Sequence, residues 1–248
     1  MKDRYFSVEV TPTIAASKQH SAAFSTGDVL FDWVEFEIPK GTSRLIGATM
    51  ITRPKGNATP TGNKFGSFLI FSKTNTLSYG TINGTTTKVP SNDYLGLLEL
   101  EDATSFTLGA GTTVGMAGRA SNNVSQANVL LTGSQTGSNV GYDKLYMAAQ
   151  ANGAFDWRSI NTVNETGFGA AAQTVITMDD GSAGTSMDCT NHFIAGDVLH
   201  AQDDAVLGTL ASATAQEITL TAANTAAIAD DDVIYNIHPI RVILHFEK

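Results

Sequence analysis

Between Thr174 and Lys248 the chain alternates short apolar segments with acidic or glycine-containing turns, and this pattern limits its fold more than any other feature. Within the segments, apolar residues tend to occupy every second position, which is the period of a strand with one buried face. Asp and Gly recur between them, where Asp side chains bond to nearby backbone and Gly accepts a positive φ. The sequence therefore predicts a compact β module, with strands at 174–178, 196–201, 205–214, 217–222, 233–235 and 238–247.

The same two-residue period recurs in the N-terminal part of the chain. It predicts further strands at residues 6–10, 34–38, 44–53, 66–72, 94–100 and 143–149. No long window shows the 3.6-residue apolar period of a capped amphipathic helix, so helices should be few and short. The sequence thus predicts an all-β protein.

The last predicted strand carries the strongest alternation, because Ile240, Val242, Leu244 and Phe246 all point to one face. Such a strand belongs inside a large sheet, and we expect it to return to the strand at residues 6–10. We therefore predict a jelly-roll-like antiparallel β-sandwich from residues 1–171, completed by residues 238–248. A small β-barrel-like module, residues 172–236, would be inserted before the last strand.

Two stretches depart from the alternating pattern. Residues 53–64 combine prolines, glycines and basic side chains and predict an exposed loop. Residues 109–141 consist almost entirely of small residues, which favours either a long loop or small-residue strands packed against a neighbour.

Composition and charge limit the classes of function. The 248 residues carry a net charge of -9, and only 16% of them are charged. Nucleic-acid binding needs clustered basic side chains, so we expect no nucleic-acid partner. No stretch is apolar enough for a membrane span or a secretory leader, so we expect no membrane partner and synthesis in a cytoplasm. Cys189 is the single cysteine, which excludes an intrachain disulfide.

Catalytic and metal motifs are missing from the sequence. The five histidines lack a metal-binding spacing, and neither a nucleophile elbow nor a phosphate-binding glycine motif is present. We therefore expect neither an enzyme nor a cofactor. The acidic clusters could bind Ca²⁺ if their turns converged, although none has the EF-hand spacing and acidic turns alone explain them: Asp179-Asp180, Asp203-Asp204 and Asp230-Asp231-Asp232.

The segment HFIAGDVLHAQDDAVLGTLASATAQEITLTAANTAAIADDDVIYN, followed by HPIRVILHFE, resembles structural proteins of tailed-phage virions, some of which are capsid decoration proteins. The resemblance covers roughly a third of the chain. It implies a virion protein on the capsid surface that binds the major capsid protein and stabilises the shell. It also implies a homo-oligomer, with a trimer as the expected form. Two alternatives stay open: a tail or fibre-associated protein that contacts a receptor, and a carbohydrate-binding β-sandwich module.

Two groups of residues are candidates for a protein interface. Basic side chains gather in the N-terminal arm and in the loop at 53–64, and they could meet acidic patches on a shell or neighbouring subunit: Lys2, Arg4, Arg53, Lys55 and Lys64. The alternative is a solvated loop. Phe155, Trp157 and Arg158 form the second group, since aromatic residues and Arg are favoured at interfaces. Trp33, in an alternating segment, should be a core residue.

Overall fold

The computed structural model of the protein describes residues 4–56, 66–87, 93–101, 106–107, 112–117, 128–133, 143–154, 156–158, 163, 170–179 and 187–248. Within these ranges the strands form three antiparallel sheets. Helical structure in them is limited to α1 (Ala16–Ser21) and the 3-10 turn η3 (Cys189–Asn191). The prediction of an all-β fold with few, short helices is confirmed.

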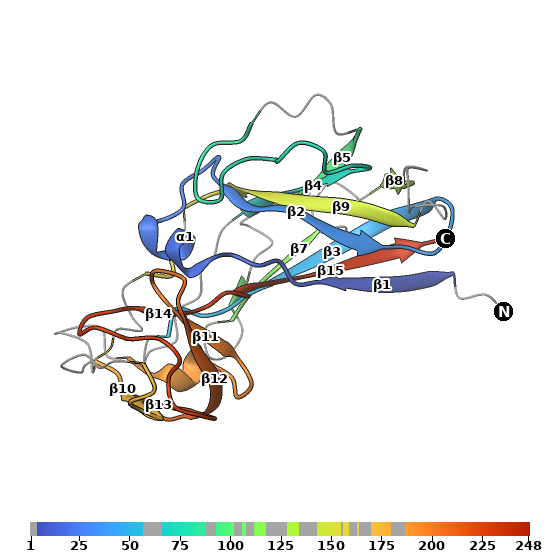
Figure 1. Ribbon diagram of the computed structural model, residues 1–248. Helices are drawn as coiled ribbons and strands as arrows, with labels where there is room; N and C mark the ends of the chain where they lie inside the picture. Colours follow the sequence, from blue (N-terminus) through green and yellow to red (C-terminus); the bar gives the residue numbers. More distant parts are fainter. Residues whose placement is uncertain are drawn as a thin grey trace.

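The first sheet brings strands from both ends of the chain together (Figure 1). Its order is β1 (Tyr5–Val10), β15 (Ile240–Glu247), β3 (Ser43–Thr52), β7 (Thr113–Ala117) and β6 (Phe106–Thr107), and β8 (Val129–Leu131) also pairs with β3. Because β15 lies between β1 and β3, the expected return of the C-terminal strand to the strand at 6–10 is confirmed. Within residues 109–141, where the sequence left open a loop or strands packed against a neighbour, the structure has the strands β7 and β8, and both pair with β3.

The second sheet faces the first and completes the sandwich (Figure 1). Its order is β2 (Val29–Glu37), β9 (Lys144–Asn152), β4 (Gly66–Ser72) and β5 (Tyr94–Leu100). The observed bounds of β4 and β5 match the predicted ones, because turn-forming residues flank a strongly apolar run in each case.

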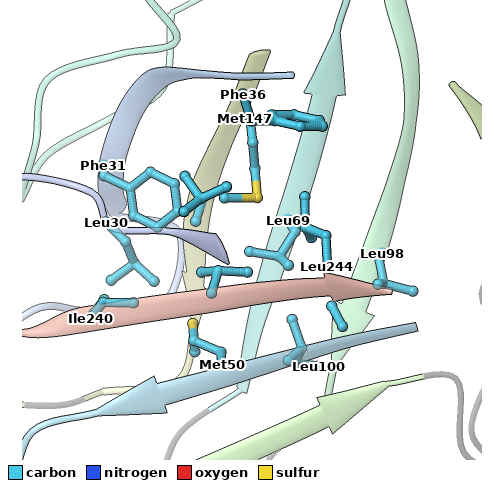
Figure 2. Close-up of a cluster of buried hydrophobic side chains, with 14 of the residues drawn as sticks. Leu30, Phe31, Phe36, Met50, Leu69, Leu98, Leu100, Met147, Ile240 and Leu244 are labelled. Atoms are coloured by element: carbon cyan, nitrogen blue, oxygen red, sulfur yellow. The ribbon is translucent and has the colours of Figure 1, made fainter. Parts of the chain in front are cut away.

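The main core lies between these two sheets and takes alternate residues from strands such as β4, β9 and β15. On β15 the four inward side chains are at most 1% exposed, whereas Arg241 between two of them is exposed. Figure 2 shows Ile240 and Leu244 of this strand among side chains of both sheets, including Leu30, Phe31, Met50, Leu69 and Met147. Burying one such apolar side chain stabilises the fold by about 1.5–3 kcal/mol. Because a strand such as β15 buries only one face in this core, the alternation of apolar residues predicted the strands.

The third sheet forms the module, at the end of the sandwich away from the two termini (Figure 1). Its order is β10 (Val175–Thr177), β13 (Glu217–Leu220), β12 (Val206–Ala213), β11 (Val198–Ala201) and β14 (Ile234–Asn236). The described strands leave β10 and β14 as edges, so no closed barrel is found among them.

The module has a hydrophobic core of its own, built around Leu199, Leu207 and Ile218. Val163, from the predicted sandwich segment, packs into this core, whereas Tyr235 of β14 packs into the main core. Side chains therefore cross the predicted division in both directions. The boundaries at residues 171 and 236 stay a prediction.

In the segment 53–64, the described residues 53–56 form the predicted loop, but the prediction that this loop is exposed is wrong. Pro54 and Gly56 are buried, and the Gly56 carbonyl accepts a hydrogen bond from the Asp188 amide at 2.8 Å. These residues pass between the sandwich and the module, which shields them from solvent. Residues 57–64 lie outside the described part of the chain.

Candidate functional site

The described residues among those predicted to form an interface do not gather on one surface. Lys2, Lys64 and Phe155 lie outside the described residues. Arg4 lies beside β15 near Glu247, whose carboxylate also binds Arg44. Arg53 lies at the opposite end of β15, where its amide donates to the Pro239 carbonyl at 2.9 Å. The structure thus separates Arg4 from Arg53 by the length of β15.

Arg53 is a structural link between the sandwich and the module. Its Nη1 and Nη2 donate to the two carboxylate oxygens of Asp197 at 2.7 and 2.8 Å, and Nη1 also donates to the His192 carbonyl at 2.9 Å. The side chains of Arg53 and Asp197 are only 21% and 11% exposed. A bidentate pair shielded in this way orients the two parts of the molecule and leaves little of the guanidinium for a partner.

Trp157 is part of the protein's own core. It is 1% exposed, its ring meets Phe24 edge to face at 6.0 Å between centroids, and its Nε1 donates to the Arg53 carbonyl at 3.4 Å. The buried indole presents no surface on which a partner could pack. The prediction that Trp157 lies at a protein interface is therefore wrong.

Arg158 and Lys55 surround Asp156. Arg158 donates to both carboxylate oxygens of Asp156, with its Nη2 at 2.9 Å from Oδ2. Burial alone would raise the pKa of Asp156, but the hydrogen bonds and charge of Arg158, helped by Lys55, outweigh burial and lower it. Arg158 therefore contributes a paired charge, and its interface role stays a prediction.

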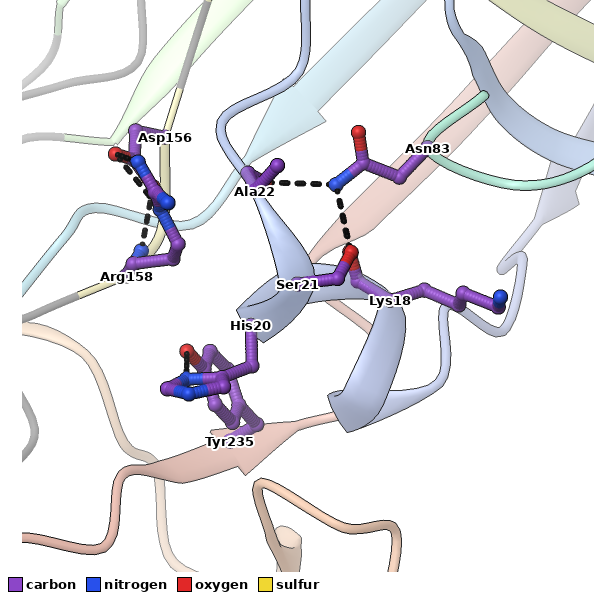
Figure 3. A network of polar contacts seen from close by, with 8 residues as sticks. All are labelled: Lys18, His20, Ser21, Ala22, Asn83, Asp156, Arg158 and Tyr235. Atoms are coloured by element: carbon purple, nitrogen blue, oxygen red, sulfur yellow. Dashed lines mark hydrogen bonds and ion pairs between the residues drawn. The ribbon is translucent and has the colours of Figure 1, made fainter. Parts of the chain in front are cut away.

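A polar network ties α1 to both parts of the molecule (Figure 3). Asn83 donates from Nδ2 to the carbonyls of Lys18 and Ala22, which satisfies the end of the helix. On the module side, Tyr235 Oη lies 3.0 Å from His20 Nδ1. Burial, and next the negative charge of Asp156, raise the pKa of Tyr235, so this hydroxyl keeps its proton at neutral pH.

His192 is a buried neutral imidazole at the same boundary. Its Nδ1 donates to the Pro54 carbonyl, and its Nε2 is buried without a hydrogen-bond partner. Burial is the main cause that lowers the pKa of His192 to about 4, and the charge of Arg53 acts in the same direction. Since the ring is neutral at pH 7, Nε2 is an unsatisfied acceptor rather than a buried cation.

A pocket of about 440 Å³ opens beside these groups. We call it the junction pocket, since its walls come from the end of β3, the start of β15 and the η3 turn of the module. Its lining includes Ile51, Arg53, Ile194, His238, Ile240 and Arg241.

A second pocket, of about 300 Å³, lies on the outer face of the second sheet. We call it the outer groove, and it is lined by Phe68, Ile70, Tyr79, Tyr94, Leu97 and Gln150. Tyr94 and Leu97 are 52% and 49% exposed. Trp33, expected in the main core, is half-buried on this outer face instead, with its ring 5.4 Å from that of Tyr79.

The polar groups of the outer groove are largely satisfied by each other. Tyr79 donates its hydroxyl to Gln150 Oε1 at 3.0 Å, and Gln150 Nε2 donates to the Gly27 carbonyl at 2.8 Å. Burial, and next the neighbouring Tyr94, raise the pKa of Tyr79 to about 12, so the donor proton stays in place at neutral pH. The groove is therefore an apolar surface held in shape by a fixed hydrogen-bond pair.

The described acidic turns form hydrogen bonds with other parts of the chain itself. Asp204 accepts from the amide and hydroxyl of Ser17 in α1, at 2.9 and 2.6 Å. Asp232 accepts from Gln202 and from the Ala229 amide. Among the described residues, no group of three or more His, Cys, Asp or Glu side chains could hold a metal ion. These contacts fit the interpretation that the acidic clusters are turn residues.

Comparison with known proteins finds no relative: no family model matches the sequence, and no curated protein is significantly similar to it. In the part of the chain that the structure describes, no helix is long and apolar enough to cross a membrane.

Sequence reasoning did not single out Asp197, Tyr79, Tyr94 or Leu97, nor did it assign a role to His192. Tyr94 and Leu97 carry one usable signal, because large apolar residues on both faces of a predicted strand indicate that the outer face is covered or binds something. The positions of His192 and Asp197 depend on contacts over more than 130 residues, for which the local sequence holds no signal.

Proposed function

We propose that this protein is a structural component of a tailed-phage virion, and specifically a decoration protein that binds the outside of the capsid shell and stabilises it. The sequence resemblance of the C-terminal segment motivates the proposal. The outer groove carries it structurally, because exposed apolar residues grouped on a rigid sheet are typical of a protein-binding surface. The expected partner is the major capsid protein.

The chemistry of the groove favours a protein side chain over a sugar. A sugar ring would bring several hydroxyl groups that lose their hydrogen bonds to water. Of the polar side chains lining the groove, Tyr79 and Gln150 already bind each other. An unsatisfied buried polar group costs about 1–3 kcal/mol. An aliphatic or aromatic side chain of a capsid subunit loses no such bonds, so it is the better occupant.

The experiment compares two aspartate substitutions in binding to capsids stripped of the protein. Leu97→Asp places a carboxylate in the groove, and we expect at least a roughly 30-fold loss of affinity, the size of a typical hot spot. Val206→Asp is the matched control, because Val206 is 45% exposed and lies on β12 of the module, away from the groove. Its binding should equal that of the parent protein.

Cryo-electron microscopy of the particle distinguishes the alternatives. Added density on the shell supports decoration, whereas density on the tail would favour the receptor-contacting alternative. If the parent protein binds neither structure, the proposed function is wrong.

A further inference from the structure

We propose that the junction pocket binds a small organic carboxylate with an apolar body. The pocket combines cationic side chains with aliphatic walls in one concave site of about 440 Å³, within the range typical of small-molecule sites. This inference does not depend on the proposed function, because it concerns the isolated protein.

The charge of the lining selects an anion. Arg53 and Arg241 line the pocket, and no Asp or Glu does so among the described residues. This differs from the chain as a whole, whose net charge is -9. Charges farther away than about 8 Å are largely screened at physiological salt, so the groups near the pocket decide its potential. Asp197 offsets the charge of Arg53, which leaves the loosely paired Arg241 as the cation that can attract an anion.

The two arginines have different roles. Arg53 is held by Asp197 in a bidentate pair with little exposure, and it maintains the wall of the pocket. Among the described residues Arg241 has one loose partner, since its Nη1 lies 3.5 Å from Glu9 Oε1 and both side chains are about half exposed, at 49% and 53%. Exposed pairs of this kind contribute little, so a ligand carboxylate can replace Glu9 as the partner of Arg241.

The apolar part of the lining requires an apolar body on the ligand. Ile51, near the end of β3, is half-buried in the wall of the pocket, and Ile194 is 64% exposed beside it, whereas the Ile240 side chain packs into the main core. Inorganic phosphate would leave these surfaces in water. A carboxylate joined to an alkyl or aromatic group would cover them and gain about 25 cal/mol for each Å² of apolar area removed from water.

The lining also supplies a neutral hydrogen-bond donor. Thr11 is exposed, and its hydroxyl can donate to a ligand. The Thr190 hydroxyl already donates to Asp188 Oδ1 at 2.5 Å, and His238 Nδ1 donates to the Pro12 carbonyl at 3.2 Å. A carboxylate has about four acceptor positions, so it can accept from Thr11 and Arg241 together.

The test is a titration of the ¹⁵N-labelled full chain with hexanoate, with hexanamide as the neutral ligand of equal shape. We expect saturable amide shifts at residues 51–53, 190–194 and 240–241, with a dissociation constant of about 1 mM. Hexanamide and inorganic phosphate should each bind at least about fivefold more weakly, because hexanamide lacks the negative charge and phosphate lacks the apolar group.

Two substitutions should move the affinity in opposite directions. Arg241→Gln should weaken hexanoate binding about fivefold, and Glu9→Gln should strengthen it, since it removes the competing carboxylate. Arg4→Gln removes the same charge beside Glu247 at the far end of β15 and should change nothing. The proposal is overturned if hexanamide binds as tightly as hexanoate, if Arg241→Gln has no effect, or if the shifts lie outside the pocket.

Discussion

His192 illustrates how burial changes the chemistry of a single residue. Its folded-state pKa of about 4 lies below the ordinary value of 6.5, so the unfolded chain takes up the proton first as the pH falls. The stabilising contribution of the neutral ring is complete above pH 6.5 and is lost between pH 6.5 and about 4. A shift of this size corresponds to about 3 kcal/mol.

We expect His192→Asn to remove this part of the pH dependence. Asparagine keeps a donor for the Pro54 carbonyl but does not titrate, so the variant should be less stable at pH 7 and lose less stability on acidification. Urea unfolding at a series of pH values between 7 and 4 measures the difference. Carboxylate groups affect both proteins equally, so parallel curves for parent and variant would contradict the prediction.

At the scale of elements, the end of β3 is joined to the start of β11 by the Arg53–Asp197 pair. Removing one member of a shielded pair leaves the other charge without compensation, so Arg53→Gln should cost about 3 kcal/mol of unfolding free energy. Arg241→Gln, which breaks the half-exposed pair with Glu9, should cost less than about 1 kcal/mol. Denaturant unfolding of both variants gives the comparison.

A double-mutant cycle with Asp197→Asn separates the pair from the other contacts of each residue. Asp197 also accepts from the Ile194 amide at 2.8 Å, so its single substitution should disturb that turn as well. A coupling energy near zero would mean that Arg53 acts through the His192 carbonyl alone.

At the scale of the whole molecule, the structure leaves apolar side chains exposed on both the sandwich and the module, including Tyr94, Leu97, Val198 and Ile194. Exposed groups of this kind can be covered by copies of the same chain. We expect a homo-oligomer, with a trimer as the predicted form, in native mass spectrometry at micromolar concentration. A monomer at every concentration would contradict the prediction of a homo-oligomer. A dimer would contradict only the prediction of a trimer.

The sequence by itself determined the all-β class of the protein and the positions of its strongly alternating strands. Period-two alternation is a local property, so the bounds of β4 and β5 and the inward face of β15 could be predicted from neighbouring residues. The small residues of β7 did not decide between loop and strand, because their pairing depends on the free edge of β3.

Only the tertiary structure decided the environment of the charged and aromatic side chains. Arg53 and Trp157 were expected at an interface, yet one is paired with Asp197, 144 positions away, and the other is buried against Phe24. Their surroundings come from segments that lie far apart in the sequence and meet only in the folded protein. The burial and the ion pairing of a side chain depend on neighbours that are distant in the sequence, so they cannot be predicted from the local sequence pattern.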